Sequence, residues 1–154
     1  DLDFATAFAK SQLGSSTVLP KSGTAFISVR EGDKQRAIVP AKRLEQLGFK
    51  LIATGGTATF LAQNGIDVEP VNKVAEGRPH IVDAIKNGDV QLVVNTTEGE
   101  KSLADSKSIR RTTLEMKIPY YTTLAGAEAA VAAIRALDEN ELSVTSLQDY
   151  AARL

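Results

Sequence analysis

The sequence has no cysteine, no tryptophan and a single histidine. Without cysteine there is no disulfide bond, no zinc site built on thiolates and no cysteine nucleophile. One histidine likewise excludes a metal site with several imidazole ligands. Aromatic residues make up only 5% of the chain, which disfavours a platform on which nucleic-acid bases stack.

Neither sign of charge is in excess. The chain has 18 Lys and Arg against 19 Asp and Glu, a formal net charge of −1. Nucleic acid and anionic membranes are therefore not expected as partners, and any anion site must be a local cluster of cations. No apolar run approaches the roughly 18 residues of a membrane span, and no signal peptide is visible. We expect a cytoplasmic protein.

The chain has the length and apolar content of one ordinary domain. Its 154 residues are 43% hydrophobic, enough for a core that buries roughly two-thirds of the unfolded surface. It begins with Asp1 rather than Met, as expected for a piece of a longer protein. Apolar residues at helical spacing within 1–14 predict a short helix, and the Ser/Thr/Pro/Gly-rich segment 14–23 predicts a linker, both outside the main fold.

From residue 24 onward, predicted strands alternate with predicted helices. The predicted strands are Thr24–Val29, Lys50–Ala53, Asp67–Val71, Gln91–Val94 and Ile118–Tyr121. The predicted helices are a stretch that reaches Leu47, with Pro40 delaying or kinking it, then Ala58–Gln63, Pro79–Asn87, Leu103–Lys117, Ala127–Leu137 and Ser146–Leu154. Strands that are apolar on both faces indicate a parallel sheet covered on each side. The predicted fold is a three-layer α/β/α sandwich around a five-stranded parallel sheet, doubly wound and Rossmann-like.

Polar residues follow every predicted strand, at the edge of the sheet where such folds bind ligands. They are Asp33 and Lys34; Thr54, Gly55, Gly56 and Thr57; Asn72 and Lys73; Asn95, Thr96 and Thr97; and Thr122 and Thr123. Thr57 opens a predicted helix with free backbone N–H groups, and the two glycines before it allow close approach of a ligand. The pattern predicts a site for one phosphate with a sugar and a base. The alternative is that these threonines and glycines are ordinary turn and capping residues.

The sequence offers no recognisable catalytic machinery. Residues 95–102 lie between a predicted strand and helix, as a phosphate-binding P-loop does, but Glu100 stands where the glycine before the lysine is required. His80 precedes a predicted helix, where a capping or packing role is expected. No carboxylate pair, Ser-His-Asp arrangement or metal-ligand cluster is visible. We therefore expect no catalytic residue, metal or cofactor in this domain.

Five segments carry a resemblance to a known family. They are Ile27–Lys34, Ala53–Thr57, Val71–His80, Val94–Thr97 and Ile109–Arg111. In this order they resemble the carboxyl-terminal regulatory domain of the carbamoyl-phosphate synthase large chain, which has the methylglyoxal-synthase-like fold. The resemblance implies that residues 1–22 are the end of a preceding synthetase region with its linker, and that residues 23–154 form the regulatory domain.

The resemblance implies a domain that binds nucleotide effectors and does no chemistry itself. The expected effectors are UMP, an inhibitor, and IMP, an activator in some bacteria. Matching phosphate-binding positions are Lys34, Thr54, Thr57 and Lys73, with Gly55 and Gly56 between the two threonines. Matching ribose and base positions are Asn95 and Thr97, with Thr96 adjacent. Thr122 matches a position near an ornithine site at a domain junction.

The resemblance also implies a longer parent protein. That parent is an ATP-dependent ligase of arginine and pyrimidine biosynthesis that uses Mg²⁺ or Mn²⁺. Its synthetase domains and its glutaminase small subunit are the expected partners, and a homo-oligomer is compatible with the family. Two alternatives stay open: a phosphate lyase of the methylglyoxal synthase type and a purely structural docking domain. Against the lyase, Arg78 stands where the family's catalytic aspartate is expected, although Glu98 lies near the position of a second family acid.

Overall fold

The computed structural model of the chain describes residues 1–96, 100–139 and 142–152, with residues 100–105 described by their backbone alone. Its α-helices are α1 (Phe4–Gly14), α2 (Lys34–Gln46), α3 (Gly55–Gln63), α4 (Ile81–Lys86), α5 (Glu100–Glu115), α6 (Leu124–Glu139) and α7 (Leu147–Ala151). Two short 3₁₀ turns are η1 (Glu31–Asp33) and η2 (Val74–Glu76). The strands are β1 (Thr24–Ser28), β2 (Lys50–Thr54), β3 (Glu69–Val71), β4 (Leu92–Asn95) and β5 (Tyr120–Tyr121). Within the described ranges, every helix is too short or too polar to cross a lipid bilayer.

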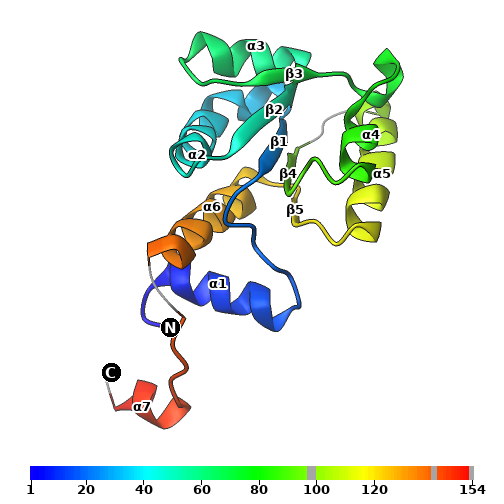
Figure 1. The fold of residues 1–154 in the computed structure, drawn as a ribbon. Helices are drawn as coiled ribbons and strands as arrows, with labels where there is room; N and C mark the ends of the chain where they lie inside the picture. Colours follow the sequence, from blue (N-terminus) through cyan, green and yellow to red (C-terminus); the bar gives the residue numbers. More distant parts are fainter. Residues whose placement is uncertain (97–99, 140–141, 153–154) are drawn as a thin grey trace.

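The five strands form one parallel sheet in the order β3-β2-β1-β4-β5 (Figure 1). The chain builds outward from β1 to β3, then returns to the other side of β1 and builds outward from β4 to β5. The strand order therefore reverses between β1 and β4. In doubly wound sheets, ligands bind outside the carboxyl ends of the strands at this reversal. The predicted fold class is confirmed.

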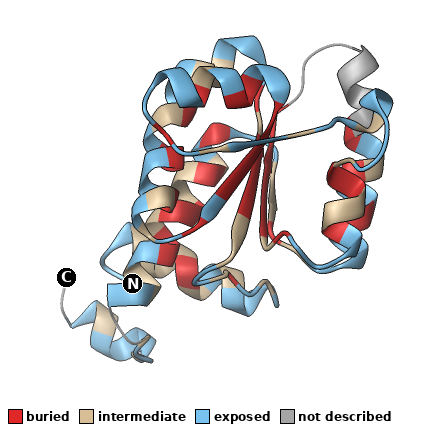
Figure 2. Cartoon of the chain, turned by 45° about the horizontal axis from the view of Figure 1, so that its top comes forward, coloured by how far each residue is buried: buried red, intermediate tan, exposed pale blue. Residues whose placement is uncertain are grey.

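Helices cover both faces of the sheet. Alternate strand residues, such as Ala25 and Ile27, pack with α2, α3 and α6 on one face. The residues between them, such as Phe26, pack with α4 and α5 on the other. Figure 2 shows that the buried residues lie in the strands and on the helix sides that face them. The period-2 alternation of the strands thus builds two cores, one on each side of the sheet.

The first helix belongs to the packed structure. α1 lies against α6, with Ala9 fully buried between them, and Leu19 of the following segment joins the same core. The Tyr121 hydroxyl donates a hydrogen bond to Gln12 Oε1 at 3.0 Å, which ties α1 to the edge strand β5. The expectation that this helix lies outside the main fold is wrong, because its apolar face is covered by α6. The domain boundary at residue 22 stays a prediction.

Two local predictions are also corrected. The segment expected to be a tight turn, Thr54 to Thr57, contains the first turn of α3, which begins at Gly55 directly after β2. Gly55 and Gly56 do not have positive φ values, so they serve a helical turn rather than a reversal. Pro40 lies inside α2, which begins at Lys34, so of the two expected effects the delay does not occur and the kink stays a prediction.

Candidate functional site at the carboxyl edge of the sheet

The strand register brings the predicted site segments together. Ser28 at the end of β1 lies opposite Asn95 at the end of β4, and Thr54 at the end of β2 lies opposite Val71 at the end of β3. The Ser28 and Thr54 hydroxyls are 2.9 Å apart and hydrogen-bonded, and Tyr121 ends β5 beside β4. The segments that follow the five strands therefore share one edge. We call it the carboxyl edge.

The threonines of the carboxyl edge hold its segments to one another. Thr54, Thr57 and Thr96 are all buried. Thr57 Oγ1 accepts a hydrogen bond from the Val29 backbone N–H at 3.2 Å, and Thr96 Oγ1 accepts one from the Arg30 backbone N–H at 3.1 Å. The segment that follows β1 is therefore hydrogen-bonded to α3 on one side and to the residue after β4 on the other. That Thr54 and Thr57 contact a phosphate, and Thr96 a ribose or base, stays a prediction.

The start of α3 places free helix N–H groups beside the Lys34 ammonium. Gly55 and Gly56 are exposed, and Thr54 makes no side-chain cap to the first turn. The first N–H groups of a helix carry partial positive charge and are satisfied by caps, water or ligands. Lys34 Nζ lies 3.7 Å from the position that a Cβ on Gly56 would take, and 5.9 Å from the centre of the Phe60 ring. A full and a partial positive charge therefore lie side by side.

Two carboxylates flank Lys34 on the segment after β1. Glu31 Oε2 lies 2.7 Å from Lys34 Nζ. Asp33 Oδ2 accepts a hydrogen bond from Arg30 Nε at 2.8 Å, and this bond, aided by the Thr96 hydroxyl, lowers the pKa of Asp33 below its usual value. The two acids therefore have different partners, Arg30 for Asp33 and Lys34 for Glu31.

Lys73 supplies a second cation to the carboxyl edge. It lies two residues beyond the end of β3 and is exposed. Its backbone N–H donates to Glu76 Oε2 at 2.7 Å, which fixes the turn η2. Its ammonium forms no ion pair with another residue in the described part of the chain. The neighbouring Asn72 donates from Nδ2 to the Pro79 carbonyl at 3.1 Å and holds the same loop.

Asn95 forms hydrogen bonds within the protein and is also a candidate ligand contact. It is 4% exposed, and its Nδ2 donates to Ser106 Oγ at 2.7 Å and to the Tyr120 hydroxyl at 3.0 Å. The Arg110 guanidinium lies 5.7 Å from the centre of the Tyr120 ring. Sequence reasoning missed Ser106 and Tyr120. Tyr120 could have been found from the alternation of side chains along β5. This alternation places the Tyr120 side chain on the α4–α5 face of the sheet, where the ring packs.

The remaining predicted positions lie at the margin of this arrangement or beyond it. Thr122 directly follows β5 and is exposed. Thr97 lies outside the described residues. Burial raises the pKa of the Tyr121 hydroxyl to about 12, so this group stays neutral at physiological pH. No group of three or more His, Asp or Glu side chains that could hold a metal ion occurs within the residues described.

An ion pair and two hydrogen bonds hold the loop before α4 against the start of that helix. Arg78 forms an ion pair with Asp83, which also accepts the His80 backbone N–H at 3.0 Å. The Arg78 hydrogen bond is the main cause that lowers the pKa of Asp83 to about 2. His80 Nδ1 in turn accepts the Asp83 backbone N–H at 3.4 Å, so His80 caps α4, as predicted. Arg78, at the position expected for a lyase's aspartate, is thus held by an acid from α4.

Fold and site together define a doubly wound α/β domain with two lysines and an uncapped helix start at the carboxyl edge of its sheet. Residues 36–122 match the MGS-like domain family, and the chain belongs to that family. A solved methylglyoxal synthase from Elizabethkingia anophelis has the same fold, with a TM-score of 0.59 over 73% of this chain and 79% of that one, at 18% identity.

The chain is also similar over nearly its whole length to carbamoyl phosphate synthase large chains. It is 57% identical over 150 residues to that of Rhizobium meliloti, 59% identical over 150 residues to that of Mesorhizobium japonicum, and 51% identical over 148 residues to that of Myxococcus xanthus. These matches cover 96–97% of this chain but only 13–14% of the relatives. The resemblance found in the sequence motifs is confirmed.

Proposed function

We propose that this chain is the effector-binding regulatory domain of a carbamoyl-phosphate synthase large chain. The observation that carries the proposal is Lys34 beside the exposed, uncapped first turn of α3 at Gly55 and Gly56. A nucleoside monophosphate is the ligand class that fits, with UMP as inhibitor and IMP as a candidate activator. The high identity to named large chains supports the same assignment.

In the proposed complex, the phosphate accepts hydrogen bonds from the first N–H groups of α3 and from the ammonium groups of Lys34 and Lys73. Charge-assisted bonds of this kind are short and strong. The anion also gains from the partial positive charge of the helix start. The Thr54 and Thr57 hydroxyls belong to the same proposed phosphate site. The sugar and base extend toward the end of β4, with Asn95, Thr96 and Thr97 as their proposed contacts.

The proposed parent is an ATP-dependent ligase of arginine and pyrimidine biosynthesis that works in the cytoplasm. ATP and Mg²⁺ or Mn²⁺ act in its synthetase domains, which together with a glutaminase small subunit are the proposed partners. An effector changes catalysis there only through unequal affinity for two states of the whole enzyme. Thr122, exposed after β5, is the proposed contact for ornithine at the junction with those domains.

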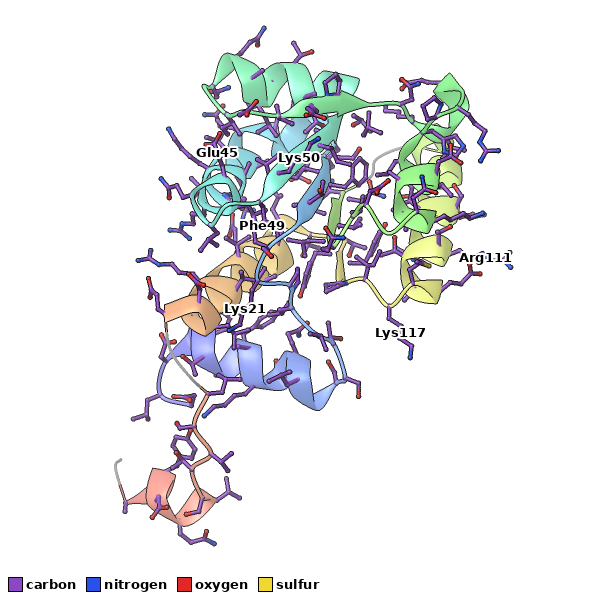
Figure 3. The ribbon with its side chains drawn as sticks, in the orientation of Figure 1. Lys21, Glu45, Phe49, Lys50, Arg111 and Lys117 are labelled. Atoms are coloured by element: carbon purple, nitrogen blue, oxygen red, sulfur yellow. The ribbon has the colours of Figure 1, made fainter. Side chains whose placement is uncertain are left out.

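Calorimetry on the purified chain tests the binding proposal. UMP, IMP and inorganic phosphate are titrated into the unmodified chain and into Lys73→Ala. Charge-assisted bonds contribute about 1.5–3 kcal/mol each, so we expect Lys73→Ala to weaken both nucleotides roughly ten- to a hundred-fold without changing their order. Lys21→Ala is the control, since Lys21 is exposed before β1 (Figure 3) and therefore lies toward the opposite edge of the sheet.

Thermal unfolding gives a second readout. A ligand at about 100 times its dissociation constant stabilises the folded chain by roughly 2.7 kcal/mol. A melting temperature indifferent to millimolar UMP, IMP and other nucleotides would refute the proposal. In the full-length enzyme, Lys73→Ala should blunt nucleotide control and leave unregulated synthesis nearly intact. Loss of synthesis at saturating substrates in a folded enzyme would instead assign this edge a catalytic or structural role.

A further inference from the structure

We infer that Glu31 is a built-in competitor for the phosphate site, whose carboxylate occupies Lys34 and must be displaced by an incoming phosphate. The inference rests on the proposed function and names a residue that sets the affinity of that site. Its basis is the 2.7 Å contact between Glu31 Oε2 and Lys34 Nζ. A carboxylate and a phosphate are both oxygen anions, and both accept the same N–H donors of a lysine.

The two partners of this ion pair are held very differently. The Lys34 side chain is 18% exposed and is fixed beside Gly56 and the Phe60 ring. The Glu31 side chain is 84% exposed and extends from the short turn η1. The carboxylate is therefore the partner that can leave, while the ammonium stays beside the start of α3. Such exposed ion pairs contribute little to stability, so displacement of Glu31 does not endanger the fold.

Of the two carboxylates near Lys34, Glu31 is the one that competes with a phosphate. Asp33, the other carboxylate of η1, is bound by Arg30, and this contact lowers its pKa. A phosphate bound to Lys34 would meet the negative charge of Glu31 at close range. Glu31 thus opposes binding in two ways, because it holds the ammonium before the phosphate arrives and repels the phosphate afterwards.

The substitution Glu31→Gln tests the inference, because it removes the charge and keeps the size of the side chain. The matched control is Glu69→Gln. Glu69 also forms an exposed ion pair, with Lys50 at 2.8 Å. Lys50 begins β2 (Figure 3), so this pair lies at the end of the sheet opposite the carboxyl edge. Both variants change the net charge by one unit and break one surface pair. Glu31→Ala serves as a second variant that removes the whole carboxylate group.

Calorimetric titration with inorganic phosphate and with UMP, at about 50 mM salt, measures the effect. We expect Glu31→Gln and Glu31→Ala to tighten both ligands by about three- to ten-fold, since a weak attraction and a similar repulsion are removed together. Glu69→Gln should bind as the unmodified chain does. The advantage of Glu31→Gln should shrink in 500 mM salt, because screening weakens exposed charge interactions.

Unchanged or weaker binding of phosphate by both Glu31 variants overturns the inference, and so does equal tightening by Glu69→Gln. Weaker binding of UMP with unchanged binding of phosphate would show that Glu31 contacts the sugar instead. In those cases the unmodified chain still binds UMP, and the proposed function stands. If neither the unmodified chain nor the Glu31 variants bind UMP or phosphate, the inference and the proposed function fail together.

Discussion

Replacing Asn95 by alanine separates the structural role of this side chain from its proposed role in binding. The substitution removes the amide that donates to Ser106 Oγ and to the Tyr120 hydroxyl. Ser106 is buried and Tyr120 is partly buried, so neither hydroxyl gains full access to water. The hydrogen bonds from β4 to α5 and to the edge strand β5 are lost.

The expected loss of stability follows from these contacts. A buried polar group deprived of its partner costs about 1–3 kcal/mol. The Ser106 hydroxyl is affected fully, whereas Tyr120 can reach solvent and is affected less. We therefore expect Asn95→Ala to lower the free energy of unfolding by about 2 kcal/mol. For a chain of this size that lowers Tm by about 4–8 °C.

Denaturant and thermal unfolding measure this loss, with Asn64→Ala as control because Asn64 is exposed and donates a single bond to the Phe60 carbonyl at 2.8 Å. Calorimetry well below Tm then compares UMP, IMP and phosphate. We expect Asn95→Ala to change the ratio of the two nucleotides more than it changes phosphate binding. A Tm within 1 °C of the unmodified chain would refute the stabilising role of the Asn95 hydrogen bonds. An unchanged ratio of the UMP and IMP affinities would refute the contact of Asn95 with the base.

Three further predictions concern the helix starts and the chemistry of the chain. Gly56→Ala should fold normally, because its Cβ would meet Lys34 Nζ at 3.7 Å, but it should weaken phosphate binding more than Gly55→Ala, whose Cβ meets nothing within 4 Å; equal affinities by calorimetry would contradict this. Because the pKa of Asp83 is lowered from 3.8 to about 2, its stabilising interactions are complete above pH 3.8 and are lost as pH falls through 2. An NMR titration midpoint near 3.8 would disprove that. Finally, the purified chain should form no methylglyoxal from dihydroxyacetone phosphate above a heat-killed control, and measurable formation would restore the lyase alternative.

The sheet was predictable because its strands are short apolar runs separated by helical patterns. The ends of the elements were less predictable. Thr54 to Thr57 reads as a turn because glycine pairs favour reversals, yet the chain continues from β2 straight into α3. Amphipathic spacing predicted α1, but spacing cannot tell which surface covers an apolar face, so its packing on α6 was missed. That contact joins residues far apart in the sequence.

The site was predictable as a set of positions and not as a set of contacts. Parallel topology alone places the residues after each strand at one edge, which is why Lys34, Lys73, Thr54, Thr57 and Thr96 could be expected together there. That they bind a ligand stays a prediction. Burial and partners depend on the register, so the hydrogen bonds of Thr57 and Thr96 to the segment after β1 could not be derived. The Glu31–Lys34 pair was within reach, because residues three apart in a helical turn face one another.

The two outer strands of the sheet have a consequence for how the chain behaves when concentrated. β3 has three residues and includes Pro70, which has no N–H to donate, and β5 has only two residues. An open edge of this kind displays very few unpaired backbone groups, so it is a poor template for a strand from another molecule. Aggregation on heating should therefore follow exposure of the two cores, and storage of the folded protein at high concentration should not seed fibres from its edges.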